Sequence, residues 1–463
     1  MYKRQPFDPS TGQPIVVNRD NFYGLLARDF DIVESDTGTV TLEHNFTDSV
    51  SLRNQLRYTN TRKDFIVTKP EYTAGANTVT RASRSRDSED DILINQTDLS
   101  VDFVTGPVNH KAVLGAELSR ETSKNRGRTI PAAVAADKFF PNPDDPYNGN
   151  IVSASLAAES TSYTAALYGV DTLEIGRYWE LNGSLRWDNF STDFTNAASQ
   201  DFSNTDSTIN YRVGLVFKPT SFGSIYGGYG TSVNPSAEGL TLSDATDELE
   251  PEETVTYELG TKWDLFDERL AIAAAIFRTQ KTNARTSAGG GAVTVLDGEQ
   301  RVDGFEFSLT GNITQAWRLF GGYTFMDSEI ESSNNAAEVG KKFANIPDHS
   351  LSLWTAYQIT PEIDVGFGAV YASERFANNT NTRFLPDYWR FDAMAGYRFN
   401  EHVDVRLNIL NLTNTTYYDS THVGQHALVG AGKRGTVEAE FDFIDEGGRP
   451  NLLPLKGGVG GVN

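Results

Sequence analysis

The feature that most constrains this chain is a succession of long segments in which apolar and polar residues alternate, joined in pairs by tight polar turns. Near the end of the chain, residues 388–399 form one such segment, residues 400–402 the turn, and residues 403–409 the next segment. A period of two places successive side chains on opposite faces, so each segment is expected to be a strand with one apolar and one polar face. A third segment, 433–443, follows a looser stretch. The pattern predicts a large antiparallel sheet.

The same pattern recurs along most of the chain and predicts roughly 17 strands, mostly about 9 to 13 residues long. Their connections alternate between short and long. Tilted strands of about 9 to 11 residues cross a bilayer, and short turns at one end with long loops at the other are typical of outer-membrane barrels. Because lipid cannot pair with an open sheet edge, such sheets close. The expected fold class is therefore all-β, an antiparallel up-and-down transmembrane β-barrel over residues 38–443, between an irregular start at 1–37 and a Gly-rich tail at 444–463.

The two faces of the expected strands suit a membrane barrel. Val255, Tyr257 and Leu259 alternate with Thr256 and Glu258. Charged residues at every second position are costly against lipid, so they are expected to line a watery lumen. A soluble β-sandwich, β-helix or propeller is the alternative. It accounts for the alternation, but not for so many long strands with a two-sided asymmetry of loops. The short turns also carry tryptophans, as an interfacial aromatic belt places them: Trp179, Trp263 and Trp317.

Composition excludes several other classes of protein. The 463 residues include no cysteine, so neither disulfides nor thiolate metal sites are available. A net charge of −22 argues against nucleic acid as a partner, because phosphate binding needs a basic surface. No apolar run approaches the roughly 18 residues of a membrane helix. Residues 1–5 are basic but run straight into a Pro- and Asp-containing stretch without an apolar core, so the start is interpreted as a truncation and not as a secretory signal.

Several motifs, in order along residues 21–443, resemble TonB-dependent siderophore receptors. In the middle of the chain they are 234–238, 249–252 and Tyr257-Glu258-Leu259-Gly260-Thr261-Lys262-Trp263, and later 345–350 and Asn408-Ile409-Leu410-Asn411-Leu412-Thr413-Asn414 with Tyr417-Tyr418. Nearer the start, 21–24, Glu43-His44 and 52–58 resemble the catecholate-type receptors in particular.

The resemblance implies a barrel of about 22 strands filled by an N-terminal plug, with an energy-coupling box before the plug. It also implies capture of a ferric siderophore by extracellular loops, followed by plug rearrangement driven through TonB from the inner membrane. The implied location is the outer membrane of a Gram-negative bacterium, in contact with lipid and lipopolysaccharide. The plug, the coupling box and about the first five strands have no counterpart in this sequence, so TonB is an expected partner only of a protein that includes them.

Two clusters of basic residues in an otherwise acidic chain are the candidate ligand-binding residues. If the long loops face outward, both clusters lie on the ligand side, where a positive potential gathers an anionic ferric chelate. Contact with anionic lipopolysaccharide, or solubility alone, is the other interpretation. The first cluster is assigned to one long loop and the second to the start of the next: Arg81, Arg84 and Arg86, and Arg120, Lys124, Arg126 and Arg128.

Other chemistry is sparse. His422 and His426 have the spacing of helical metal ligands, but their loop setting favours solvated histidines. No Ser/His/Asp or paired-carboxylate arrangement stands out, so no catalytic residue, resident metal or covalent cofactor is expected. The expected function is a ferric-siderophore receptor and transporter, with the ferric siderophore as its transported ligand. A passive porin-like channel is the alternative, and an outer-membrane enzyme or adhesin is a third class.

The strand at 433–443 gives a direct test of the truncation. In a complete barrel the last strand pairs with the first. If the first strands are missing, residues 433–443 are expected at an unclosed edge, or closed only by distortion. Regular pairing with the strand expected at residues 38–46 would contradict the truncation.

Overall fold

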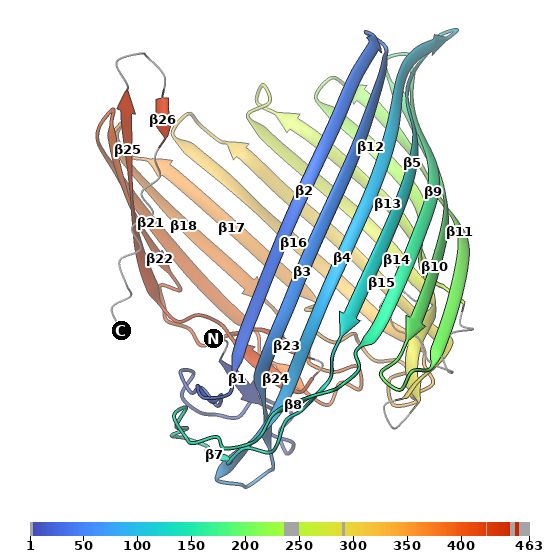
Figure 1. Ribbon diagram of the computed structural model, residues 1–463. Coiled ribbons are helices and arrows are strands. Elements are labelled where there is room, and N and C mark those ends of the chain that lie inside the picture. Colours follow the sequence, from blue (N-terminus) through green and yellow to red (C-terminus); the bar gives the residue numbers. More distant parts are fainter. Residues whose placement is uncertain (1–2, 236–249, 289–291, 423, 445–449, 453–463) are drawn as a thin grey trace.

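The computed structural model describes residues 3–235, 250–288, 292–422, 424–444 and 450–452, which build one large antiparallel sheet of barrel form (Figure 1). This confirms the all-β, up-and-down transmembrane architecture and the approximate number of strands. Seventeen long strands form the wall in the described residues: β2 (Phe30–Thr47), β3 (Val50–Tyr72), β4 (Thr78–Thr105), β5 (Val108–Asn125), β9 (Ala158–Ile175), β10 (Trp179–Thr195), β11 (Asp201–Thr220), β12 (Gly223–Asn234), β13 (Glu252–Leu265), β14 (Leu270–Ala288), β15 (Ala292–Asn312), β16 (Trp317–Ser332), β17 (His349–Gln358), β18 (Ile363–Ala372), β21 (Tyr388–Asn400), β22 (Val403–Leu410) and β25 (Arg434–Ile444).

The strand register sorts the side chains into an outer and an inner face. Residues directly opposite in an antiparallel pair share a face. Leu167 of β9, Trp187 of β10 and Ile209 of β11 stand in one row across the wall. These three side chains are 58%, 38% and 61% exposed, and similar rows of exposed apolar side chains continue on the other strands. A belt of exposed apolar residues on one face of a barrel sheet is the lipid-contacting surface.

The connections at the two ends of the wall differ in length. The turns drawn at the top of Figure 1, such as residues 106–107 and 176–178, contain at most four residues. Gly106 and Gly176 have φ of 61° and 62°, a left-handed conformation that makes such tight turns possible. The connections at the bottom include the long stretches 126–157 and 411–433. In outer-membrane barrels the long loops are extracellular, so the lower end in Figure 1 is the outer one.

The two ends of the wall series are not paired with each other. Although the sheet as a whole has the form of a barrel, the one ladder of β2 among the described residues is with β3. β25 pairs with β22 and with the short strand β26 (Pro450–Leu452). Within the described residues no ladder joins β25 to β2, as expected for the strand at 433–443 (Figure 1). We call the boundary between β2 and β25 the seam.

A layer of short strands and loops covers the long-loop end; we call it the loop layer. Residues 3–29 and the long connections build it, around two small cores. One contains Phe7, Leu385 and Ala427, and the other contains Tyr23 and Val79. Its strands are β1 (Arg4–Pro6), β23 (Tyr418–His422) and β24 (His426–Val429) in one sheet, β6 (Arg128–Thr129) with β8 (Val152–Ser153), β7 (Ala136–Asp137) with β4, and β19 (Arg375–Phe376) with β20 (Phe384–Leu385).

The loop layer joins the two sides of the seam. The start of the chain pairs with its end, because β1 forms a ladder with β24. The hydroxyl of Tyr418 on β23 donates to Gln5 Oε1 at 2.9 Å. On the other side of the seam, Tyr23 packs against Val79 of β4. The stretch expected to be irregular up to residue 37 therefore contributes β1 and the first part of β2, which begins at Phe30. Of the expected tail at 444–463, only residues 444 and 450–452 lie among the described residues.

None of the residues that the structure describes forms a helix with the length and apolarity needed to cross a membrane.

Candidate ligand-binding site

A cavity of about 390 Å³ lies where β3 and β4 meet the hairpin β23–β24 at the long-loop end of the wall. Its lining is strongly basic, and we call it the basic pocket. Asp31 of β2 is the one carboxylate among its described lining residues. The cationic and imidazole side chains that line it come from the start, the first wall strands and the end of the chain: Arg4, Lys63, Lys69, Arg84, His422 and His426.

The register explains why these side chains converge. On β3, Lys63, Phe65 and Lys69 occupy every second position and therefore share one face. Arg84 of β4 lies opposite Val67 and belongs to the same face. Leu56 and Tyr58, two of the exposed apolar side chains, occupy the other face of β3. The basic pocket therefore lies on the lumen side of the wall.

A buried polar cluster holds this part of the wall in place. Arg28 is 4% exposed and donates from Nε to Asp29 Oδ1 at 2.9 Å. Asp29 Oδ2 accepts from both the amide and the hydroxyl of Thr68, at 2.9 and 2.6 Å. Thr68 lines the basic pocket, so residues 28–29 fix the end of β3 against the loop layer. Such a satisfied buried network is rigid, because each partner is costly to unpair.

The two histidines face each other across the β23–β24 hairpin. His422 is directly opposite His426, with ring centroids 5.7 Å apart. His426 is 4% exposed, and its Nδ1 is buried without a hydrogen-bond partner among the described residues. Burial, and then the nearby Arg4, His422, Lys69 and Arg84, lower the pKa of His426 to about 3. The expectation of two solvated loop histidines is therefore wrong for His426, although His422 is exposed.

This environment suits an anion better than a metal cation. Among the residues that the structure describes, no three His, Asp or Glu side chains lie close enough together to hold a metal ion. The cations around the basic pocket repel a metal ion, whereas a ligand with carboxylate or phenolate oxygens meets several donors there. Lys69 is engaged with Glu71, and Arg84 makes one long hydrogen bond, from Nη2 to Gln425 Oε1 at 3.4 Å.

Of the seven basic residues proposed from the sequence, two have structural roles. Arg81 is 1% exposed and donates to the carbonyls of Tyr23 and Asn142 at 2.9 and 2.7 Å. It also forms an ion pair with Asp145 at 2.7 Å. These bonds fix loop 126–157 and the N-terminal segment against β4. A guanidinium whose donors are occupied in this way has none to spare for a ligand.

Arg128 has a similar anchoring role. Its Nη1 lies 2.7 Å from Asp64 Oδ1, its Nη2 lies 3.1 Å from Asp87 Oδ2, and its side chain is only 9% exposed. It therefore ties the beginning of loop 126–157 to β3 and β4. The side chain of Arg126 is exposed, and its backbone amide donates to the carbonyl of Asp87 at 2.8 Å.

The wall separates the remaining candidates. Arg84 and Arg86 lie on the lumen face of β4, in register with Val67 and Phe65 of the basic pocket. Arg120 and Lys124 occupy the outer face of β5. Arg120 is opposite Tyr163, which is 50% exposed on the lipid-contacting side, and Lys124 pairs with Glu159 at 3.4 Å. The two clusters therefore do not form one surface.

The assignment of the first cluster to a loop is wrong, because Arg81, Arg84 and Arg86 belong to β4, which begins at Thr78. Arg4, Lys63 and Lys69 also line the basic pocket but are not among the residues predicted from the sequence. The run from Lys63 to Lys69 carried a signal that could have found two of them, since its basic and apolar residues share every second position.

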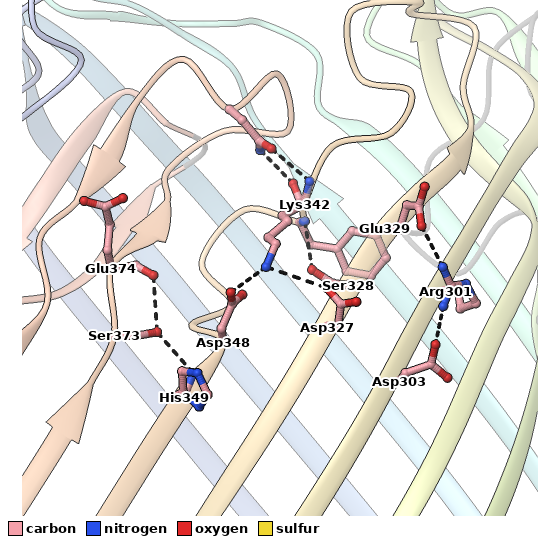
Figure 2. A network of polar contacts seen from close by, with 12 residues as sticks. Arg301, Asp303, Asp327, Ser328, Glu329, Lys342, Asp348, His349, Ser373 and Glu374 are labelled. Atoms are coloured by element: carbon pink, nitrogen blue, oxygen red, sulfur yellow. Dashed lines mark hydrogen bonds and ion pairs between the residues drawn. The ribbon is translucent and has the colours of Figure 1, made fainter.

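The polar network in Figure 2 shows a different charge balance elsewhere at this end of the wall. Lys342 contacts Asp327 at 3.6 Å and also Asp348, which ties connection 333–348 to β16. Arg301 of β15 is held by three carboxylates. Acidic groups outnumber basic ones in this network, so an anion is better accommodated in the basic pocket: Asp303, Asp327, Glu329, Glu331 and Asp348, against Arg301 and Lys342.

A lipid-facing barrel wall, long loops at one end and a basic lumenal pocket beneath them define a membrane receptor or channel of the outer-membrane type. The chain belongs to the family of TonB-dependent receptors. A family model described as "TonB dependent receptor-like, beta-barrel" matches residues 2–412. The family consists of receptors, and its relatives place the protein in the outer membrane of a Gram-negative bacterium.

Individual relatives agree with this assignment. The chain is 31% identical to the probable TonB-dependent siderophore receptor PiuA of Acinetobacter baumannii, over 93% of this chain and 64% of that protein. It is 33% identical to the probable TonB-dependent receptor BfrD of Bordetella pertussis, over 95% and 65%. It is 30% identical to the catecholate siderophore receptor Fiu of Escherichia coli K12, over 87% and 59%. The chain thus spans between 59% and 65% of the length of these curated relatives.

Solved structures show the same fold. The crystal structure of PiuA superposes with a TM-score of 0.89 at 30% identity, covering 95% of this chain and 69% of that one. The closed form of the ferric-catecholate import receptor Fiu superposes with a TM-score of 0.83 at 29% identity, covering 94% and 68%.

Proposed function

We propose that this chain forms the barrel of a receptor that imports ferric siderophores of the catecholate class, with TonB supplying the energy. PiuA is named as a siderophore receptor and Fiu as a catecholate siderophore receptor, and both resemble this chain over most of its length. The role is that of a receptor and not of an enzyme, and its ligand is a transported one, not a resident cofactor.

The observation that carries the proposal is the basic pocket. In a chain with a net charge of −22, four cations and two histidines gather on the lumen face beneath the long loops. Catecholate groups bound to ferric iron present anionic oxygens, and clustered Arg and Lys side chains attract and bind such oxygens. Arg84 and Arg86 remain candidate ligand-binding residues, joined by Arg4, Lys63 and Lys69.

We also propose a role for the outer-face cations. Arg120 and Lys124 lie on the lipid-contacting side of β5 toward its long-loop end. At that height an outer-membrane protein meets the anionic headgroups of outer-leaflet lipid and lipopolysaccharide. These two residues suit contact with that layer better than contact with a siderophore.

Uptake of radioactive iron separates the receptor from the passive channel. Iron-starved cells that express the receptor with its plug and coupling box are given the ferric complex of 2,3-dihydroxybenzoate, with and without an active TonB system. The proposed function predicts saturable uptake that stops when TonB is inactive. A passive channel gives uptake that is linear in concentration and indifferent to TonB. The absence of any uptake above that of cells without the protein contradicts both.

A further inference from the structure

Arg375, in the short strand β19 of the loop layer, carries a buried charge that no carboxylate pairs with. It is 5% exposed, and it forms no ion pair with any residue that the structure describes. Its Nη2 donates to two backbone carbonyls of β23, those of Tyr418 at 2.7 Å and Asp419 at 2.8 Å. Its Nη1 is buried without a hydrogen-bond partner in the described part of the chain. Burying a guanidinium with an unsatisfied nitrogen is costly, so this arrangement needs a compensating role.

That role lies in the two carbonyls and not in a missing partner for Nη1. This nitrogen is sealed from solvent, so neither a ligand nor a polypeptide segment inside the lumen can reach it in this conformation. What Arg375 does contact is an irregular part of β23. One nitrogen binds two successive carbonyls there, which a regular strand would direct to opposite sides.

The irregularity is a β-bulge. The ladder between β23 and β24 shifts register between Tyr418 and Ser420, so that Asp419 is an extra residue on β23. The extra residue of a bulge has no partner in the ladder, and the strand bends there. Arg375 supplies a donor to the carbonyls at this point and thereby stabilises the bulge.

The bulge decides which side chains of β23 face the basic pocket. His426 and Leu428 of β24 line this pocket, and they are opposite His422 and Ser420 of β23. Residues directly opposite in an antiparallel pair share a face, and His422 accordingly lines the pocket as well. Asp419, the extra residue, is not among the described residues that line it.

Without the bulge, β23 would be shifted by one residue against β24. Because the side-chain period of a strand is two, a shift of one residue exchanges its two faces. Asp419 would then stand opposite Leu428, in the place of Ser420, and His422 would no longer be opposite His426. A carboxylate would face the basic pocket, and a carboxylate there repels an anionic ligand.

We propose that Arg375 is a positioning residue for the basic pocket. It stabilises the bulge at Asp419, and the bulge directs His422 toward the pocket and keeps the carboxylate of Asp419 out of it. The consequence for ferric-siderophore binding rests on the proposed function. The effect of Arg375 on the register of the β23–β24 hairpin does not depend on it.

Disulfide cross-linking reports the register, because the chain has no cysteine of its own. The Cβ atoms of directly opposite residues in an antiparallel pair are about 4.5–5.5 Å apart, close to the distance that a disulfide requires. In the parent, Ser420→Cys is expected to cross-link to Leu428→Cys under mild oxidation, whereas Asp419→Cys is not. Arg375→Leu is expected to exchange the two results.

Arg383→Leu is the matched control for the cross-links. Arg383 also donates a guanidinium hydrogen bond to the backbone of this hairpin, but at the carbonyl of Gly424, away from the bulge. Its replacement is expected to leave the pattern of cross-links as it is in the parent. An exchange of the cross-links in Arg383→Leu would show that any loosening of the hairpin shifts the register, and it would overturn the specific role of Arg375.

Equilibrium binding shows whether the register matters for the ligand. The Kd of the radioactive ferric 2,3-dihydroxybenzoate complex is expected to rise about tenfold in Arg375→Leu, because a carboxylate then faces the anionic ligand. Deletion of Asp419 removes the bulge and keeps Ser420 opposite Leu428. In that background Arg375→Leu is expected to leave the Kd unchanged. If Arg375→Leu alone does not fold, recovery of folding and binding on deletion of Asp419 supports the proposal, and no recovery overturns it.

The remaining outcomes are separable. Parent-like cross-links in Arg375→Leu overturn the proposal, whether or not affinity is lost. Exchanged cross-links with an unchanged Kd also overturn it, because the register then has no effect on the ligand. A parent protein that does not bind the ferric complex contradicts the proposed function, while exchanged cross-links in Arg375→Leu still support the role of Arg375 in the register.

Discussion

Replacing Arg84 by Gln is expected to weaken binding of a ferric catecholate while leaving the fold intact. Arg84 is exposed, and its one hydrogen bond to a residue that the structure describes, Gln425, is long at 3.4 Å. Substitutions at such positions usually change stability by no more than about 0.5 kcal/mol. The side chain lines the basic pocket with its guanidinium available to an anion.

The magnitude follows from the charged contact that is lost. A hydrogen bond to a charged group contributes about 1.5–3 kcal/mol, and each 1.4 kcal/mol is a factor of ten in Kd. Because the basic pocket also holds Arg4, Lys63 and Lys69 and is open to water, the lower value applies. The expected effect of Arg84→Gln is therefore an increase in Kd of about tenfold, and it should shrink at high salt as charges are screened.

The assay is equilibrium binding of the radioactive ferric 2,3-dihydroxybenzoate complex to the purified protein in detergent. Arg120→Gln is the matched control, since it removes the same charge from an exposed position on the outer face of the wall. Its Kd is expected to stay within twofold of the parent. If Arg84→Gln also binds within twofold of the parent, or if Arg120→Gln loses as much affinity as Arg84→Gln, the basic pocket is not the binding site.

Two further predictions concern the loop layer. Arg81→Ala is expected to destabilise the loop layer by about 3–5 kcal/mol, because Asp145 and two carbonyls lose a buried partner. Limited proteolysis should then cleave within residues 126–157. Unchanged resistance to the protease would refute the anchoring role of Arg81. The pKa of His426 is about 3 in the folded protein, below its ordinary value of 6.5, so between these values the unfolded chain binds a proton that the folded chain does not. The stability of the β23–β24 hairpin should therefore fall as the pH drops from about 6.5 toward 3. Hydrogen exchange should show this loss of stability in the parent protein and much less of it in His426→Gln. An equal loss in both proteins would contradict the assignment of the pH dependence to His426.

The barrel could be predicted from the sequence because lipid imposes a period of two on the strands. Where one face contacts lipid, as for Tyr257 and Leu259, apolar residues recur at every second position and the strand is readable. The short turns could be predicted for the same reason, since they interrupt the alternation of apolar and polar residues. The strand count followed from these two signals. The expectation that β25 does not pair with β2 came instead from the family resemblance, which implies strands that this sequence lacks.

The ends of β3 and β4 could not be predicted in this way. Their residues from about 61 to 90 extend toward the loop layer, where polar side chains meet water or other polar groups on both faces. Without lipid on one side, most of this stretch lacks the alternation of apolar and polar residues that marks the wall strands, so the sequence indicates a loop. The same error placed Arg81 and Arg84 on one surface, although Arg81 is buried under loop 126–157 and Arg84 faces the lumen.

The basic pocket could not be predicted from the sequence for another reason. Its residues come from positions as far apart as Arg4, Lys69 and His426, and only the β1–β24 ladder and the meeting of the hairpin with β3 bring them together. Local periodicity carries no information on such contacts. The alternation from Lys63 to Lys69 could have shown that two lysines share a face, but not what they face.

The most direct test of the central claim is energised iron uptake by a host that lacks its own catecholate receptors. Cells that express the receptor with its plug and coupling box in the outer membrane are starved of iron and supplied with the radioactive ferric 2,3-dihydroxybenzoate complex. The receptor function predicts saturable uptake that is abolished by inactivating TonB and reduced by Arg84→Gln at concentrations below saturation. Uptake that rises linearly with concentration and continues without TonB would contradict it.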